Sequence, residues 1–502
     1  MWAAIEAIFK HVSQTDSFAT GSTPTGADEQ FSFILLGITG DLSRKKLMPT
    51  LFSLYRQNLL PRNINIIGYA RSKTSVDDIR KSVDPYVALK DNEERAQYEN
   101  FWKLNSYFHG NTDKASDYVA VEEHLKMLET GKGAANRLFY LALPPTVYAA
   151  TASALHSALM SQTGWNRLII EKPFGRDSES SNTLSEELSK LFTEDQIYRI
   201  DHYNPFLYHV LNESNSKHCS SMRSFSANRE SEGAFGIIRD VVQNHLLQVL
   251  CLVAMDRPDT NDAEKIRDEK VKLLKQMEIL DLKDVVLGQY VGKAKGSGES
   301  LLGYLDDKGV PKDSTAATFS LVVLHINNER WKGVPFFIRS GKALNESRVE
   351  VRIQFKGYDN DLFDGQSKHN EIIIRLQPNE AIYQRLNIKR PGMGFTVQET
   401  ELDLTYATRY HVRAPALLPQ TSDCLKAELP DAYERLLMDV FEGSQINFVR
   451  TDELREAWRV FTPALNHIDN HKIQPFQYEF GSHGPKEADA LQARYGHKRR
   501  NN

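Results

Sequence analysis

A histidine inside an apolar helix is the residue best placed in this sequence to move a proton. Residues 235–254 read FGIIRDVVQNHLLQVLCLVA, and Asp240, Gln243, Asn244 and His245 interrupt the apolar run. Polar side chains in the buried part of a helix cost free energy unless they have partners. A lone helix histidine is more often a satisfied core residue. One accompanied by Asp and Asn and facing a cofactor domain is a better candidate for a general base.

A glycine turn near the start of the chain has the composition of a phosphate-binding loop. The apolar run Phe31–Leu36 is typical of a buried parallel strand and stops at Gly37-Ile38-Thr39-Gly40. The two glycines allow a sharp turn and a close approach to a ligand, and the segment after Asp41 predicts a helix whose first amides suit a pyrophosphate. The pattern is shorter than the three-glycine dinucleotide-binding fingerprint, so these residues alone leave an ordinary strand–helix turn as an equal alternative. Pro49 predicts that the helix begins near it or kinks there.

The loop after the second predicted strand favours NADP over NAD. The strand Asn65–Ala70 is followed by Arg71 and Lys73, with no acidic residue before Asp77. NAD-binding units usually place Asp or Glu here to bond the ribose hydroxyls, whereas an arginine fork can grip a 2′-phosphate. The alternative is a solvated basic loop.

The first half of the chain alternates strands and helices, which predicts an α/β, doubly wound parallel (Rossmann-like) sheet. The remaining elements are predicted strands over Asn136–Leu143, Asn166–Ile170 and Gln196–Tyr203, and predicted helices over Thr146–Met160 and Ser178–Phe192. Lys172 and Asp201-His202 should then lie at the carboxyl ends of neighbouring strands, where such sheets bind ligands.

The second half changes to consecutive strands from about Thr315, which predicts a larger α+β domain with a mainly antiparallel sheet. The predicted strands are Thr318–Ile326, Phe336–Arg339, Val349–Phe355, Glu371–Leu376 and Ile382–Ile388. Basic residues decorate them at Lys342, Arg348, Arg352, Arg375 and Arg385. As surface bases they mean little, but as an inward-facing set they could hold several phosphates.

The composition is that of an ordinary globular enzyme. The 502 residues are 41% hydrophobic and 25% charged, with a net charge of −4, so we expect no nucleic-acid or membrane partner. The three cysteines show no paired spacing and no apolar run reaches the roughly 20 residues of a membrane span. We therefore expect a cytoplasmic protein. No metal-ligand spacing is present, so no metal is predicted.

Together, five motifs resemble the glucose-6-phosphate dehydrogenase family over almost the whole chain. They are Gly37-Ile38-Thr39-Gly40-Asp41-Leu42, Glu171-Lys172-Pro173-Phe174-Gly175, Arg199-Ile200-Asp201-His202-Tyr203, Arg239-Asp240-Val241-Val242-Gln243-Asn244-His245 and Gly341-Lys342-Ala343-Leu344-Asn345-Glu346. The run Leu429–Arg435 adds to the match.

The resemblance implies oxidation of D-glucose 6-phosphate at C1 to 6-phospho-D-glucono-1,5-lactone with reduction of NADP, the first oxidative step of the pentose phosphate pathway. It implies that His245 is the base that takes the C1 hydroxyl proton and that Asp201 orients and charges it. The implied substrate-binding residues are Lys172, His202, Asp240, Lys342 and Gln377. The implied coenzyme-binding residues are Gly37, Thr39, Gly40, Asp41, Arg71, Tyr148 and Lys172.

The resemblance also bears on organisation. Some members of the family carry a second, structural NADP, and its positions match Arg339, Arg348, Arg352, Arg375, Tyr383, Arg385 and Asp403. We expect a flexible arm over 1–30, an NADP-binding domain over 31–203, and a substrate-binding and dimerisation domain over 204–502. The implied assembly is a homodimer or homotetramer.

The sequence departs from the family in two segments. After Tyr203 the family continues Leu-Gly-Lys, and here Phe206 stands at the position of that lysine. Residues 204–234 are rich in Ser and Asn, which favours a loop over a core strand, and the first strand of the family's large sheet is not evident there. Residues 411–428 look like an insertion. These departures suggest an alternative reading, a catalytically impaired NADP-binding isoform or a mis-assembled gene model.

Overall fold

The structure is a computed structural model that describes residues 29–201, 219–225 (backbone only), 236–260, 262–293, 296–356, 367–378, 380–394, 396–405 and 432–497. The chain forms two compact units. Unit 1 comprises Met1–His202, Asp259–Arg267 and Pro430–Arg455, and unit 2 comprises Tyr203–Pro258, Asp268–Leu429 and Glu456–Asn502. The predicted division by function into 1–30, 31–203 and 204–502 stays a prediction. No helix among the described residues is long and apolar enough to cross a membrane.

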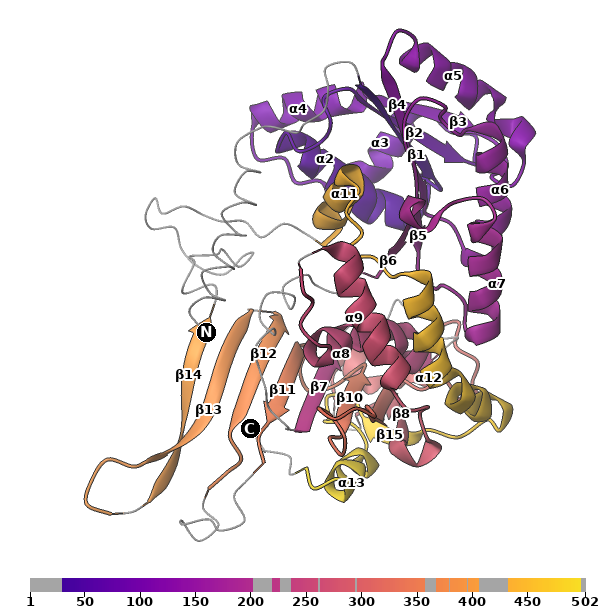
Figure 1. Ribbon diagram of the computed structural model, residues 1–502. Helices are drawn as coiled ribbons and strands as arrows, with labels where there is room; N and C mark the ends of the chain where they lie inside the picture. The colour runs from indigo at the N-terminus through magenta and orange to yellow at the C-terminus, as the bar shows by residue number, and fades with distance from the viewer. Residues whose placement is uncertain are drawn as a thin grey trace. The chain divides into compact units, whose positions relative to one another are not determined.

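Unit 1 is built on a six-stranded, wholly parallel sheet in the order β3-β2-β1-β4-β5-β6, which confirms the predicted doubly wound fold (Figure 1). The strands are β1 (Glu29–Leu36), β2 (Ile64–Ala70), β3 (Asn105–His109), β4 (Ala134–Leu141), β5 (Asn166–Glu171) and β6 (Ile197–Ile200). The order reverses between β1 and β4, and in open sheets of this kind ligands bind outside the carboxyl ends of the strands at that point.

Helices cover the sheet of unit 1 and complete its core. They are α2 (Met48–Arg56), α3 (Val76–Val83), α4 (Asn92–Trp102), α5 (Val119–Glu129), α6 (Tyr148–Ala158), α7 (Ser178–Ser189) and α11 (Ala432–Glu442). Figure 1 shows α11 beside α2, although the two lie far apart in the sequence. Leu437 and Val440 of α11 are buried in one cluster with Phe33 of β1 and Leu51 of α2.

After the glycine turn, α2 begins beside the predicted proline. Pro49 lies in the first turn of α2, which starts at Met48, and helical backbone from Asp41 onward leads into it. A short π-helix, η2 (Ser43–Leu47), precedes it. The first of the two alternatives for Pro49, a helix that begins near it, therefore holds for α2.

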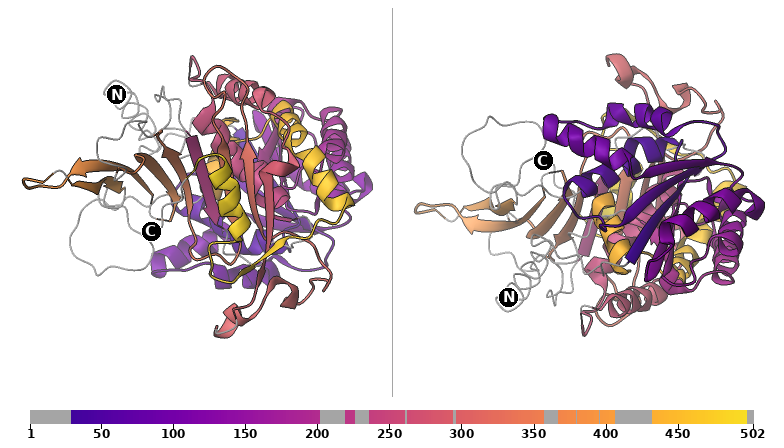
Figure 2. Two further views of the ribbon diagram at one scale, coloured as in Figure 1. Left: turned by 90° about the horizontal axis from the view of Figure 1, so that it is seen from below. Right: turned by 90° about the horizontal axis from the view of Figure 1, so that it is seen from above.

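Unit 2 is built on a nine-stranded sheet in the order β14-β13-β12-β11-β7-β10-β9-β8-β15. Neighbouring strands are antiparallel except for the pairs β7–β10 and β8–β15, which confirms the mainly antiparallel prediction. The strands are β7 (Cys219–Phe225), β8 (Val285–Val291), β9 (Phe319–Leu324), β10 (Phe336–Gly341), β11 (Val349–Gln354), β12 (Glu371–Gln377), β13 (Ala381–Lys389), β14 (Val397–Thr405) and β15 (Phe476–Glu479). The hairpin of β13 and β14 extends beyond the neighbouring strands of its own sheet (Figure 2).

The prediction of a loop throughout 204–234 is wrong at Cys219–Phe225. These residues form β7, which pairs in parallel with β10 from Ser220↔Phe336 to Phe225↔Gly341 and antiparallel with β11. Serine-rich composition is a weak local signal, and backbone pairing with strand edges on both sides overrides it. The rest of 204–234 lies outside the described residues, as do Phe206 and the predicted insertion 411–428.

The helices of unit 2 include the segment predicted over 235–254. It is a π-helix, η8 (Ile238–Leu246), followed by α8 (Leu247–Ala254). The others are α9 (Ala263–Gln276) and α12 (Thr451–Asn470), whose first turns belong to unit 1, and α13 (Lys486–Arg494).

Candidate active site

The carboxyl ends of the parallel strands in unit 1 bring several predicted residues to one edge of the sheet. Leu36 of β1 pairs with Tyr69 of β2 and with Leu141 of β4, so Gly37 and Arg71 follow adjacent strand ends. Glu171 of β5 pairs with Ile200 of β6, so Lys172 and Asp201 also follow neighbouring ends, as predicted. His202 lies outside the described residues.

The glycine turn has a backbone that no other residue could adopt there without strain. Gly37 has φ +86°, and a Cβ on it would lie 2.2 Å from the carbonyl oxygen of Ala142. The Gly37 carbonyl accepts hydrogen bonds from the Gly40 N–H (2.9 Å) and the Ser43 hydroxyl (2.9 Å), which closes the turn. Thr39 and Gly40 remain exposed at its tip. The turn is therefore ordered and accessible, as a pyrophosphate loop must be.

Basic side chains flank this turn. Asp41 is exposed and forms ion pairs with Arg44 (2.5 Å) and Lys45 (2.9 Å). The hydrogen bond from Lys45, together with both positive charges, holds the pKa of Asp41 below its ordinary value. The carboxylate thus orients two cations of the first helical turn. Arg71 and Lys73 are exposed directly after β2.

A buried carboxyl at the end of β5 is a feature that the sequence analysis missed. The side chain of Glu171 is buried and accepts hydrogen bonds from the hydroxyls of Tyr140 (2.6 Å) and Tyr433 (3.2 Å). Burial raises its pKa to about 6, against the lowering effect of the two hydroxyls. The hydroxyl of Tyr148, also buried, donates to the Glu171 carbonyl at 2.9 Å. Glu171 therefore fixes the backbone from which the half-buried Lys172 projects. In the sequence, only the position of Glu171 next to Lys172 could have indicated this role.

The π-helix of unit 2 carries two predicted residues. With hydrogen bonds from i to i+5, residues five apart point in more similar directions than in an α-helix, where five residues turn the side chain by about 140°. Asp240 and His245 are five apart in η8. The Asn244 side chain supports this turn because its amide donates to the carbonyls of Arg239 and Asp240, both at 3.1 Å, and its oxygen accepts from the His245 N–H at 2.7 Å.

Asp240 of this helix forms a charge pair with Lys342. Lys342, which follows β10, lies 3.7 Å from the carboxylate of Asp240. His245 is buried, at 7% exposure. The helix and the end of β10 thus bring a carboxylate and an ammonium group together in unit 2, and His245 stands on the same helix.

The predicted basic set on the large sheet is partly buried: Arg348 and Arg352 are buried, and Lys342, Arg375 and Arg385 are half-buried. Arg352 lies 2.6 Å from Glu350, which also pairs with Arg348 at 3.5 Å. Arg375 donates to the Tyr383 hydroxyl at 3.2 Å, and Arg385 pairs with Glu401 at 3.1 Å.

Three atoms of this set, Arg348 Nε, Arg352 Nη2 and Arg375 Nε, are buried without a hydrogen-bond acceptor among the described residues. Arg339 instead contacts Asp489 of α13 at 3.4 Å and the His483 carbonyl. Gln377 and Asp403 are exposed.

Family models match both halves of the chain. The model "Glucose-6-phosphate dehydrogenase, NAD binding domain" matches residues 34–204, and "Glucose-6-phosphate dehydrogenase, C-terminal domain" matches residues 232–500. Among relatives, glucose-6-phosphate 1-dehydrogenase of Ceratitis capitata is 46% identical over 97% of this chain and 93% of its own length. Glucose-6-phosphate 1-dehydrogenase 2 of Mus musculus is 48% identical over 92% of this chain and 91% of its own.

Solved structures agree. A glucose-6-phosphate dehydrogenase in complex with its substrate glucose-6-phosphate superposes with a TM-score of 0.84 at 39% identity, over 95% of this chain and all of that one. Glucose-6-phosphate 1-dehydrogenase from Mycobacterium avium has a TM-score of 0.76 at 30% identity, over 92% of this chain and 96% of that one.

Proposed function

The chain belongs to the glucose-6-phosphate dehydrogenase family, and we propose that it oxidises D-glucose 6-phosphate to 6-phospho-D-glucono-1,5-lactone as it reduces NADP to NADPH. The observation that carries this is the match of both family models, in order, over almost the whole chain. The reaction is the first oxidative step of the pentose phosphate pathway. The presence of β7 in the large sheet removes one of the grounds for an impaired isoform.

The residues of unit 1 suit NADP. Bound NADP supplies the acceptor for the hydride that leaves C1 of the sugar. The turn at Gly37 admits only a glycine and leaves Thr39 and Gly40 open to a pyrophosphate. Arg71 offers a guanidinium fork to the 2′-phosphate, and Lys172 follows the end of β5. Tyr148 opens α6 and donates its hydroxyl to the carbonyl of Glu171, the residue before Lys172.

His245 is proposed to remove the proton from the C1 hydroxyl, because hydride leaves C1 readily only as that hydroxyl loses its proton. Asp201 is proposed to orient the imidazole and to stabilise its protonated form. Burial of His245 restricts its motion, and Asn244 fixes the helical turn on which it stands.

Charged groups are proposed to hold the substrate. Lys342 and His202 would contact the phosphate, Asp240 and Gln377 would bond sugar hydroxyls, and Lys172 would lie between the nicotinamide and the sugar. The 3.7 Å pair of Lys342 with Asp240 supports this assignment because it places a cation and a hydroxyl acceptor side by side.

A second, structural NADP is proposed on the large sheet. The buried donors without an acceptor, on Arg348, Arg352 and Arg375, fit a phosphate-bearing ligand. Tyr383, Arg385 and Asp403 belong to the adjacent strands β13 and β14, whereas the contact of Arg339 with α13 gives that residue a different setting. A homodimer or homotetramer and a cytoplasmic location complete the proposal.

A spectrophotometric assay tests the proposed function. Purified protein should produce NADPH absorbance with glucose 6-phosphate and NADP, and much less with glucose, because glucose lacks the phosphate that Lys342 and His202 would hold. Absence of NADPH with glucose 6-phosphate at saturating NADP, in a preparation that binds NADP, would support the impaired isoform instead.

A further inference from the structure

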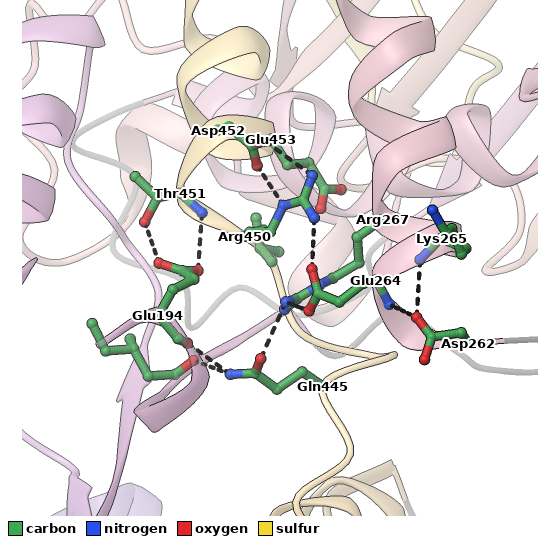
Figure 3. Close-up of polar contacts among 12 residues, drawn as sticks. Glu194, Asp262, Glu264, Lys265, Arg267, Gln445, Arg450, Thr451, Asp452 and Glu453 are labelled. Atoms are coloured by element: carbon green, nitrogen blue, oxygen red, sulfur yellow. Dashed lines mark hydrogen bonds and ion pairs between the residues drawn. The ribbon is translucent and has the colours of Figure 1, made fainter. Parts of the chain in front are cut away.

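Three segments far apart in the sequence meet along the outer edge of β6 (Figure 3). β6 is the last strand of its sheet and only four residues long. Its free edge is covered by the segment Gln445–Thr451, which forms an antiparallel bridge between Phe448 and Ile200 and a hydrogen bond from the Val449 N–H to the Arg199 carbonyl at 3.3 Å. Without this segment, the outer N–H and C=O groups of the short edge strand would lack backbone partners.

The first layer of polar contacts centres on the carboxylate of Glu194, just before β6. It accepts hydrogen bonds from Arg199 Nη1 (2.6 Å), from the Thr451 N–H (3.1 Å) and from the Thr451 hydroxyl (2.6 Å). Arg199, which is buried, also donates from Nη2 to the Thr451 hydroxyl at 2.7 Å. The Thr451 hydroxyl therefore joins both charges, and the carboxylate satisfies the first N–H of α12.

The second layer is the side chain of Gln445. Its amide nitrogen donates to the backbone carbonyls of Glu194 (2.8 Å) and Ile197 (3.0 Å), and its oxygen accepts from Arg267 Nη2 at 3.1 Å. Arg267 is buried and pairs with Glu264, which also binds Arg450 at 2.7 Å. The Gln445 side chain thus binds both Glu194, which lies just before β6, and the first residue of β6, Ile197.

We propose that Arg199, Glu194, Thr451 and Gln445 form a clamp that positions Asp201 for the reaction. Asp201 follows Ile200 directly, so the direction of its carboxylate depends on how firmly β6 is held. Groups that orient a base need to be placed within about 0.5 Å to be effective. The four residues are positioning residues, and the inference rests on the proposed role of Asp201.

The first test removes the hydroxyl that joins the two charges. Thr451→Val keeps the size of the side chain but loses the hydroxyl's bonds to Glu194 and Arg199, while the backbone N–H still donates to Glu194, so kcat should fall by about 10- to 100-fold. The Michaelis constant for NADP should stay within about twofold, because the glycine turn on β1 is not touched. Thr451→Ser retains the hydroxyl and should restore kcat. A Thr451→Val enzyme with normal kcat would overturn the proposal.

A double-mutant cycle separates positioning from general stability. If Thr451 acts through Asp201, Thr451→Val should lower kcat no further in an Asp201→Asn background, whereas a purely structural effect would add to it. Additive losses would overturn the clamp. Normal kcat in Asp201→Asn alone would instead overturn the role of Asp201 in the proposed function. Gln445→Met provides a second variant for the same cycle should Thr451→Val fail to fold.

Discussion

At the scale of single residues, Arg71 is the residue that we propose selects NADP over NAD. Replacing Arg71 with Ala should raise the Michaelis constant for NADP by about 10- to 100-fold, since a charge-assisted bond to the 2′-phosphate is worth about 1.5–3 kcal/mol. The constant for NAD should change little. Steady-state kinetics with both coenzymes measure this.

Arg62 offers a matched control because it is exposed and precedes the same strand that Arg71 follows. Arg62→Ala should leave both constants unchanged. Equal weakening of NADP and NAD in Arg71→Ala would refute the assignment.

Glu171 is the residue whose ionisation should be visible in stability. Its folded-state pKa is raised from 4.5 to about 6, so the stability that it contributes is fully present below pH 4.5 and is lost as the pH rises through 6. At pH 8 the loss is about 2 kcal/mol by the shift in pKa. Glu171→Gln cannot ionise, so its stability relative to the natural protein should improve between pH 5 and pH 8.

Urea unfolding at the two pH values measures this change. Glu123→Gln, an exposed position on α5, is the control for the loss of a carboxylate that is not buried. A Glu171→Gln variant whose relative stability is the same at pH 5 and pH 8 would contradict the raised pKa.

At the scale of elements, β7 makes the sharpest prediction. Its backbone pairs on both sides, with β10 and with β11. Hydrogen exchange of a peptide spanning residues 219–225 should therefore be slow, comparable with β10 and slower than the edge strand β14. Exchange as fast as in an exposed loop would contradict the pairing of β7 and would favour the loop that the Ser-rich composition predicts.

The elements that the sequence predicted best have continuous apolar runs. β1, β2, β4 and β5 lie within two residues of their predicted bounds, because buried parallel strands consist almost wholly of apolar residues. No element was predicted between residues 74 and 133, where α3, α4, β3 and α5 lie. β3 has no fully buried residue, so it lacks the apolar run by which a strand is recognised. β7 was mistaken because its stability comes from neighbours more than 100 residues away in sequence.

At the scale of the whole molecule, the division of the chain could not be read along the sequence. Asp259–Arg267 and Pro430–Arg455 belong to unit 1 through contacts such as Gln445 with Arg267 and Tyr433 with Glu171. No local pattern marks such pairings. Likewise, residue types alone left His245 open between a core residue and a base. The motifs taken together identified the family, which both family models confirm.

The turnover of a His245→Asn variant tests the central claim most directly. Asparagine keeps a polar side chain of similar reach but cannot accept the C1 hydroxyl proton, so kcat with glucose 6-phosphate and NADP should fall by about 10²- to 10⁴-fold with little change in substrate affinity. His156→Asn, an exposed position on α6, should turn over normally. Normal turnover by His245→Asn would contradict the account and show that this histidine is a core residue without a catalytic role.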